Sequence, residues 1–418
     1  MGVAPCTAHD KRLFLANCSG DTFTTDRSGA IAIHTWQVAR AARRAGYKPV
    51  ILTRRGTGTA LSAPDAHFVR WPEPRTRASR RLRRYAYHLG GTLLPSPHAM
   101  YAARLVREIR RYPPPHRVLF GNDPEVLVHV RERLPDSRLI HLFHSPHPAS
   151  DQMKDRLVAS ADALAAVSMF TARECAGDYG VTPAAVALAY NGVDLAEFQP
   201  PRSRREIDQP LIGFTGTFSP LKGLDLLLDA ALDLDREGKR FRLRLVGDFY
   251  WGEENVHAYA ADVQRQVDAL RSAGVEVDWR GRLSRDEVMQ SAPEVDIAVI
   301  PSRREEAFGL VLAEAMACAS AVVASRAGGM PEVLGDAGLY FERKSRSGLA
   351  EQLRRVIEDG CLRFSLGQRA RQRATRFTWD ATWAALELLL FASVPLDQPG
   401  RKPLDDPRRS TLDLADER

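Results

Sequence analysis

Short apolar runs typical of buried strands alternate with helical patterns along most of the chain. In the first half these runs cover residues 12–17, 48–53, 116–121, 138–143 and 163–168, and in the second half 211–216, 242–247, 276–281, 297–302 and 321–325. Between the first two runs, residues 30–47 carry apolar side chains at helical spacing and close on Gly46, a helix C-terminal signal. This alternation predicts an α/β fold, with parallel sheets covered by helices on both faces.

The length of 418 residues exceeds what one hydrophobic core usually organises, so we expect two or three domains. The segment "EFQPPRSRREIDQP" is rich in Pro, Arg and Ser and lacks periodicity, as a linker does. The predicted order is a Rossmann-like, doubly wound domain over 1–200, a linker over 201–210, a second such domain over 211–376, a returning helix over 377–392 and a disordered tail over 393–418. Two such domains face each other across a cleft, where ligands of these sheets bind.

The composition also indicates where the protein works. No apolar run reaches the roughly 18–20 residues that a membrane-spanning helix needs. Residues 1–20 lack the basic start and the long apolar stretch of a signal peptide. The five cysteines are scattered and form no Cys-x-x-Cys pair, which favours free thiols in a reducing compartment over disulfides or a zinc site. We therefore expect a cytoplasmic protein without a bound metal.

Positive charge is concentrated in residues 70–117, which hold 12 Arg against two acidic residues. In its helical part, 100–112, an apolar side opposes a basic one, formed respectively by Leu105, Val106 and Ile109 and by Arg104, Arg107 and Arg111. We interpret the stretch as a solvated, arginine-rich cover of the sheet. An anionic acceptor, or docking on the anionic inner face of a membrane, remains as an alternative. Nucleic acid is not expected, because no recognition module accompanies the charge.

Residues 213–230 run from a strand through a Gly-containing turn into a helical pattern, with Lys222 just before the helix. Such a turn lets the backbone approach a ligand, and a helix N-terminus offers N–H groups to phosphate oxygens. Lys222 adds a positive charge for the same anion. The order of residues is not that of a Walker loop. An ordinary turn that happens to contain one lysine is the alternative interpretation.

Glu306 and Glu314 bracket the run "AFGLVLA", which is otherwise apolar or Gly. We place Glu306 in the loop before a helix and Glu314 inside it, so that the amides of Phe308, Gly309 and Leu310 form an exposed helix N-terminus between the acids. Carboxylates accept hydrogen bonds from paired hydroxyls, and N–H groups bind phosphate. The pattern therefore fits a nucleoside diphosphate sugar. The alternative is an amphipathic helix whose two ends reach the surface.

This Glu-x7-Glu pattern, with Gly309 three residues after Glu306, resembles the signature of the retaining family-4 glycosyltransferases. Four further segments resemble motifs of that family in the same order: "AYNGVDLAEFQP" (189–200), "VDIAVIPS" (295–302), "AGGMPEV" (327–333) and "FTW" (377–379). The resemblance covers about residues 160 to 390 and is weaker in the first half. It implies the two-domain GT-B fold, with two Rossmann-like domains facing a cleft.

The resemblance also implies roles for matching residues in a donor site. Glu306 aligns with the acid that contacts donor-sugar hydroxyls, and Glu314 with the one that holds the ribose. Gly309 and Leu310 supply N–H groups near the diphosphate, and Lys222 aligns with the phosphate-binding lysine.

One position departs from the family pattern. After the turn's Gly216 the family carries an arginine, whereas this chain has Thr217, which has no charge. Either another arginine replaces it, with Arg303, Arg304 and Arg326 nearby in the sequence, or stabilisation of the leaving group is weaker.

The first half contains weaker candidates. "TTDRSGAIAIHTW" (24–36) stands where the family has a Gly-rich loop near donor phosphate and acceptor, but it holds one glycine, Gly29. Asn122 and Asp123 follow a predicted strand, where they would meet acceptor hydroxyls. A turn cap explains these two side chains equally well.

Three histidines, His141, His144 and His147, follow one another at three-residue intervals at the end of a predicted strand. Neither an i,i+4 pair nor a carboxylate supports a metal triad. The family places a histidine at the end of this strand, facing the reaction centre, and His144 fits that position. A loop histidine that is hydrogen-bonded to the backbone is the alternative.

The sequence thus predicts a metal-independent glycosyltransferase that moves a sugar, with retention of configuration, from a nucleotide-sugar donor to a hydroxyl acceptor. By the resemblance alone we expect a UDP-sugar. No cofactor is expected, since the nucleotide sugar is a substrate. An epimerase acting on sugar nucleotides and a catalytically weakened nucleotide-sugar-binding protein are the alternatives. The sequence specifies neither the acceptor nor the oligomeric state.

Overall fold

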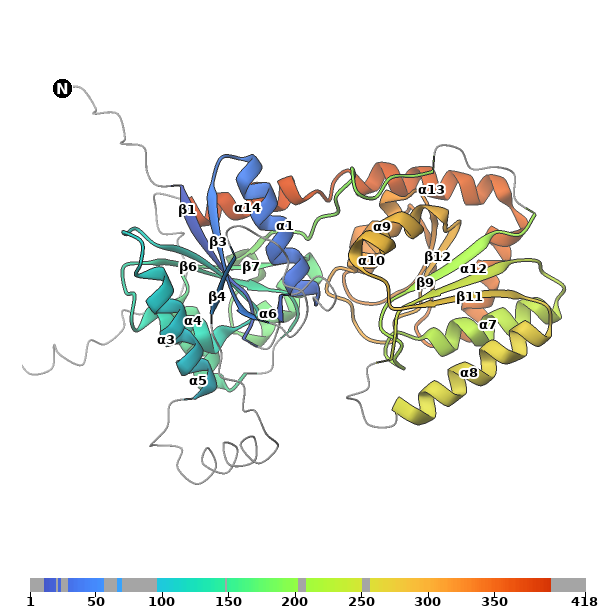
Figure 1. Cartoon of the computed structure of the whole chain (residues 1–418), viewed down its shortest axis with the longest axis horizontal. Helices are drawn as coiled ribbons and strands as arrows, with labels where there is room; N and C mark the ends of the chain where they lie inside the picture. The colour runs from blue at the N-terminus through green and yellow to red at the C-terminus, as the bar shows by residue number, and fades with distance from the viewer. Residues whose placement is uncertain are drawn as a thin grey trace, which may run out of the picture.

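The computed structural model describes residues 11–19, 22–23, 29–55, 66–69, 96–146, 149–201, 208–249 and 256–391. Within these ranges the chain forms two parallel sheets, each covered by helices on both faces (Figure 1). The α/β prediction of two doubly wound sheets is therefore confirmed. The predicted tail 393–418 lies outside the described residues, as do His147, most of the linker and most of the basic stretch 70–117.

The first sheet has eight described strands in the order β2-β3-β1-β5-β6-β7-β8, with β4 also paired to β3. Their bounds are Arg12–Ala16, Thr22–Phe23, Lys48–Arg55, Ala66–Val69, Arg117–Gly121, Arg138–Phe143, Ala163–Ala166 and Val186–Leu188 for β1 to β8. The helices are α1 (Ala30–Arg44), α3 (Pro97–Ile109), α4 (Pro124–Arg131), α5 (Asp151–Ser160) and α6 (Met169–Asp178), with a short 3-10 turn at Pro183–Ala185.

The second sheet has six described strands in the order β11-β10-β9-β12-β13-β14. Their bounds are Leu211–Thr215, Arg242–Val246, Glu276–Gly281, Ile297–Ile300, Ala321–Ser325 and Leu339–Phe341 for β9 to β14. The helices are α7 (Leu224–Arg236), α8 (Val256–Ser272), α9 (Arg285–Ser291), α10 (Leu310–Ala317), α11 (Met330–Leu334), α12 (Arg346–Glu358), α13 (Gly360–Ala374) and α14 (Trp379–Phe391), with a 3-10 turn at Ala292–Glu294.

Alternating strand residues divide each domain into two cores, as the period-two geometry of a strand requires. In β1, Leu15 packs toward the core that contains α1, whereas Phe14 packs toward the core that contains α3 and α4. In β13, Val322 and Val323 divide in the same way. The core around α1 continues without a break into that around α10 and α13, so buried apolar contacts join the two domains.

The last helix returns to the first domain. α14 lies beside α1 and over β5 and β6 (Figure 1), although about 235 residues or more separate it from them in sequence. The "NGVD" segment (191–194) packs on the "FTW" segment (377–379). The Val193 N–H donates to the Phe377 carbonyl at 2.9 Å, and a Cβ at Gly192 would stand 2.4 Å from the Trp379 nitrogen. Only glycine allows the two crossing strands of chain to approach this closely.

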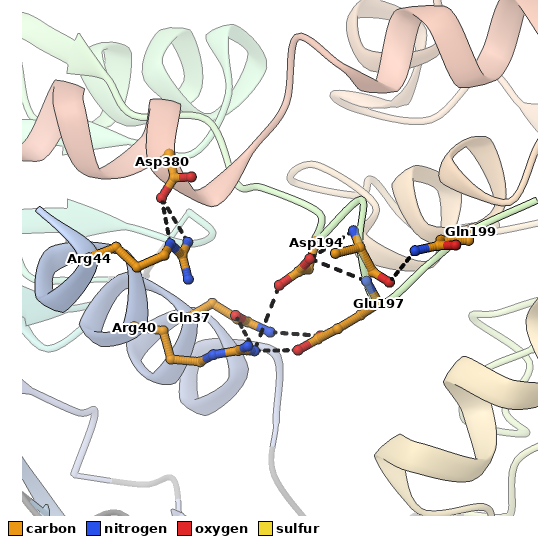
Figure 2. Close-up of polar contacts among 8 residues, drawn as sticks. Gln37, Arg40, Arg44, Asp194, Glu197, Gln199 and Asp380 are labelled. Atoms are coloured by element: carbon orange, nitrogen blue, oxygen red, sulfur yellow. Dashed lines mark hydrogen bonds and ion pairs between the residues drawn. The ribbon is translucent and has the colours of Figure 1, made fainter.

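Polar contacts hold the segment between the domains against α1 (Figure 2). Arg40 pairs with Glu197 and lies 3.8 Å from an Asp194 oxygen, while Gln37 donates to Glu197 at 3.4 Å. On the other side, Arg371 of α13 donates to the carbonyl of Phe198 at 2.8 Å. Residues 194–198 are thus anchored to both domains, which fixes where the cleft between them opens.

The amphipathic pattern in the basic stretch is confirmed for the part that the structure describes. In α3, Leu105, Val106 and Ile109 are buried, Arg104 is half-buried and Arg107 is exposed, and Arg111, just beyond the helix, is also exposed. None of the helices in the described ranges combines the length and the apolar character that crossing a membrane would take. Contact with a lipid surface stays a prediction.

Candidate active site

A cavity of about 720 Å³ opens between the two domains at the carboxyl ends of their strands. This position is the one expected for ligands of doubly wound sheets, and the volume suits a substrate of moderate size. Nine of the sequence-predicted residues line it: His144, Gly216, Thr217, Lys222, Glu306, Phe308, Gly309, Leu310 and Glu314. The fold therefore brings residues up to 170 positions apart in the sequence to one cavity, with His144 on the side of the first domain and the other eight on the wall that the second domain forms.

Lys222 and Glu306 form an ion pair on that wall. The Lys222 Nζ lies 2.6 Å from Glu306 Oε1, and the Ser302 hydroxyl donates to the same oxygen at 2.5 Å. Lys222 precedes α7 directly, as predicted, and Glu306 lies in the loop before α10.

Glu314 lies in the second turn of α10 and is buried. Arg285 of α9 donates to its Oε1 at 2.5 Å, and the Arg285 guanidinium stands 4.7 Å from the ring centre of Phe198, in the segment between the domains. A buried carboxylate is costly without a partner, so the charge of Arg285 offsets the cost of burying Glu314. The predicted ribose acid thus has an arginine partner that the sequence did not reveal.

α10 starts at the cavity, and no side chain of the described residues caps its first turn. Its N-cap, Gly309, has φ of 87° and no side chain that could cap the first turn. The N–H groups of the first helical turn normally lack an intrahelical acceptor, and they carry the positive end of the helix dipole. Phe308 anchors this start, because its buried ring lies 5.6 Å from the ring of Phe377. The arrangement favours an anion such as a phosphate.

The "AGGMPEV" segment positions Glu306. The N–H of Gly329 donates to the Glu306 carbonyl at 2.7 Å. Gly328 has φ of 56°, and a Cβ there would stand 2.2 Å from the same carbonyl oxygen. Further on, Glu332 accepts a 2.9 Å hydrogen bond from the Met169 N–H at the start of α6, in the other domain. Burial raises the pKa of Glu332, although hydrogen bonds from α6 oppose the change.

Thr217 is exposed at the cavity, at the position where the resembled family has an arginine. Of the three nearby arginines, Arg303 is engaged by Asp225, with N–O distances of 2.6 and 2.9 Å. Arg326 pairs with Glu342 at 3.4 Å and stacks on Tyr340. Arg304 is exposed and lines the cavity.

His144 reaches the cavity from the end of β6. Its ring meets His34 edge-on, with 4.6 Å between ring centres, and burial lowers the pKa of His144 to about 3. The pKa of His34 is also lowered, by burial and then by His144. His144 is therefore a neutral imidazole at physiological pH. Its Nε2 is buried and, within the described part of the chain, has no hydrogen-bond partner.

The other predicted residues of the first half lie behind the cavity wall. Asn122 accepts from the backbone N–H of His144 at 3.1 Å, so it shapes the loop that carries this histidine. Asp123 caps α4 and accepts from the Ser19 N–H at 2.8 Å. Burial would raise the pKa of Asp123, but hydrogen bonds from His98 and Ser19 lower it overall. Gly29 is the N-cap of α1. The lining residues nearest to it in sequence are Ala30 and Ile31.

Asn191 and Arg285 line the cavity but were not among the residues predicted for the site. Asn191, in the "NGVD" segment, is 6% exposed and has an Oδ1 without a hydrogen-bond partner among the described residues. The motif that contains Asn191 was recognised, so a signal existed. Arg285 stands in "LSRDEV", where the sequence pattern indicates only a capped helix start, and the structure confirms a capping box at Ser284.

The two sheets and the cavity between them define a class: a two-domain α/β protein with a candidate active site between its domains. A family model described as "Glycosyltransferase Family 4" matches residues 31–197, and one described as "Glycosyl transferases group 1" matches residues 196–373. Together they cover both domains. The chain belongs to the family-4 glycosyltransferases.

Curated relatives agree with this family. D-inositol 3-phosphate glycosyltransferase of Kineococcus radiotolerans is 33% identical over 261 residues, which is 57% of this chain and 59% of the relative. That of Streptomyces bingchenggensis is 30% identical over 252 residues, 58% of this chain and 55% of the relative. The chain thus matches little more than half the length of these relatives.

Solved structures share the fold. A glycosyltransferase from Rickettsia africae aligns over 91% of this chain and 100% of its own, with a TM-score of 0.71 and 16% identity. Anabaena Alr3699/HepE, in complex with UDP and glucose, aligns over 92% and 100%, with a TM-score of 0.68 and 20% identity. At these identities the likeness concerns the GT-B fold.

Proposed function

We propose that the chain is a retaining glycosyltransferase that transfers a sugar from a UDP-sugar to a hydroxyl acceptor, without a metal ion. The observation that carries the proposal is the single cavity wall on which Glu306, the N-terminus of α10 and Glu314 follow one another. This wall offers acceptors for hydroxyls, donors for a diphosphate and again an acceptor for hydroxyls. A nucleotide sugar presents these groups in the same order.

The chemistry needs stabilisation of the departing diphosphate more than a protein nucleophile. Lys222 and the first-turn N–H groups of α10 supply positive charge and donors at that point, which is the role that a metal would otherwise fill. The acceptor hydroxyl oxygen bonds to the anomeric carbon on the face from which the diphosphate leaves. The bond from that carbon to the phosphate oxygen breaks, and this oxygen takes the acceptor's proton.

Neutral His144 contributes on the acceptor side of the cavity. Because burial lowers its pKa to about 3, the ring carries no charge, and it can donate one hydrogen bond from one nitrogen and accept one at the other. We assign it to a hydroxyl of the sugar or of the acceptor. The acceptor itself is proposed as a small molecule, a glycan or a lipid-linked sugar, and a phosphorylated polyol joins the candidates because the curated relatives are named for inositol 3-phosphate.

One incubation tests the proposal against its alternatives. The chain is mixed with UDP-, GDP- and ADP-sugars, and released nucleotide is measured with and without a panel of acceptors that includes inositol 3-phosphate. Release that depends on an acceptor, with the anomeric configuration kept in the product, supports the proposal. Conversion of one sugar nucleotide into another without release identifies an epimerase instead. Binding without either reaction identifies the weakened nucleotide-sugar binder that Thr217 suggests.

A further inference from the structure

Most charges around the cavity are already matched by a neighbour. Among the lining residues that the structure describes, the acids are Glu305, Glu306 and Glu314 and the permanent cations are Lys222, Arg285 and Arg304. Lys222 pairs with Glu306 at 2.6 Å, and Arg285 with Glu314 at 2.5 Å. Glu305 pairs with Arg343, which lies outside the lining, at 2.5 Å.

This pairing leaves Arg304 as the one lining cation that no described carboxylate neutralises. A diphosphate brings about two negative charges into a partly dehydrated site, where each uncompensated charge is costly. The charge of Lys222 is balanced by Glu306, and that of Arg285 by Glu314. These pairs leave the cavity wall without a net positive charge. Some further cation has to face the diphosphate, because Thr217 cannot.

The neighbouring arginines cannot take this role without losing contacts. Arg303 holds Asp225 with two nitrogens and also donates to the Pro220 carbonyl at 3.0 Å. Arg326 is stacked on Tyr340, away from the lining residues. Arg304 instead stands two residues before Glu306, in the same loop, and is exposed to the cavity. A guanidinium can bind two phosphate oxygens at once, so it suits a diphosphate.

We propose that Arg304 replaces the arginine absent at Thr217 and binds the donor's diphosphate, together with Lys222. This inference rests on the proposed function, of which it names one binding residue. It explains how a chain with an uncharged residue at position 217 can still stabilise a leaving diphosphate. It also predicts that the two positions are interchangeable as the source of one positive charge.

The test uses four variants of the full chain: Arg304→Ala, Arg304→Lys, Thr217→Arg and the double variant Arg304→Ala with Thr217→Arg. Turnover is measured with the donor that the wild type uses. Binding of UDP, GDP or ADP is compared with binding of the matching nucleoside by calorimetry. We expect Arg304→Ala to lower turnover by about 10² and to weaken diphosphate binding while nucleoside binding is unchanged. Arg304→Lys should retain more activity than Arg304→Ala. In the double variant, Thr217→Arg should restore most of the activity that Arg304→Ala loses.

Arg326→Ala is the matched control, since it removes an exposed arginine outside the cavity, and its turnover should equal that of the wild type. Turnover of Arg304→Ala within about threefold of the wild type overturns the inference, as does a loss that neither Arg304→Lys nor Thr217→Arg recovers. If the wild type binds no nucleoside diphosphate and consumes no donor, the proposed function fails, and this inference with it. An active wild type with an equally active Arg304→Ala variant overturns the inference alone.

Discussion

Lys222 and Glu306 hold each other in place on the cavity wall, and this pairing has a consequence for ligand binding. A donor that places its sugar at Glu306 and its diphosphate at Lys222 enters between two charges that already attract each other at 2.6 Å. Lys222 is 41% exposed in its side chain, whereas Glu306 is 18% exposed. The lysine is therefore the partner that can turn toward a phosphate while the acid, also bound by Ser302, remains fixed.

Replacing Lys222 by Ala should slow turnover strongly. The variant removes one charge that stabilises the leaving diphosphate, and a single donor of this kind typically contributes about 10² to 10³ in kcat. The measurement is steady-state release of nucleotide at saturating donor and acceptor. Lys239→Ala is the control, because Lys239 also pairs with an acid, Glu358, but is not among the cavity-lining residues. A Lys222→Ala rate close to that of the wild type would contradict the role.

At the scale of elements, hydrophobic patterning located the central strands well. The sequence-predicted runs at 138–143, 276–281 and 321–325 coincide with β6, β11 and β13, and the other predicted runs overlap their strands. β6 and β13 are buried along almost their whole length and have largely apolar sequences, whereas β11 lies at the sheet edge and is only partly buried. The described strands that patterning missed are short or lie toward the sheet edges, such as β2 with two residues and β8 and β14 with three. Periodicity over so few residues carries no signal, and pairing with a neighbour forms these strands.

The loop between β12 and α10 depends on Gly328, and Gly328→Ala should displace it. The substitution places a Cβ 2.2 Å from the Glu306 carbonyl oxygen, in addition to a left-handed backbone cost of about 1–2 kcal/mol. We expect a lower unfolding temperature and weaker donor binding, because Glu306 moves.

Gly180→Ala separates the two effects. Gly180 has a similar φ of 63°, but nothing lies within 4 Å of the added Cβ. This control should lose stability through its backbone alone and keep the wild-type affinity for the donor. Equal donor affinities in Gly328→Ala and Gly180→Ala would show that Gly328 does not position Glu306.

At the scale of the whole molecule, the residues of the site fall into two groups. Some lie within local sequence motifs, and others are brought to the cavity by tertiary packing. Those in the second-half motifs were predictable, since strand, turn and helix start follow one another in sequence, and Lys222, Glu306 and Glu314 all line the cavity. Asn191 reaches the same cavity from the first domain, just before the segment that Arg40 holds (Figure 2), whereas Arg285 reaches it from α9 in the second domain, where it pairs with Glu314 of α10. Local pattern contains no information on such long-range contacts, so these two residues needed the structure.

The stability of the folded chain should depend on pH through the histidines of the first domain. Burial lowers the folded-state pKa of His144 to about 3 and also lowers that of His34, so in acid the unfolded chain binds protons that the folded chain excludes. Stability is therefore lost as pH falls below about 6.5, by on the order of 1 kcal/mol for His144 at about pH 5.5. His98 has the opposite sign, because its hydrogen bond to Asp123 raises its pKa, and its contribution is lost as pH rises.

Thermal unfolding of His144→Gln and His98→Gln, followed from about pH 7.5 to about pH 5.5, distinguishes these contributions. As the pH falls, the unfolding temperature of His144→Gln should fall less steeply than that of the wild type. The variant no longer has the imidazole that binds a proton only in the unfolded chain. The unfolding temperature of His98→Gln should fall more steeply than that of the wild type, because the variant lacks the imidazole whose protonation stabilises the folded chain. Both histidines lie in the first domain, where α1, α3 and α4 pack on the sheet that contains β1 and β5. Parallel pH profiles for both variants would therefore mean that neither imidazole is coupled to folding as its surroundings require.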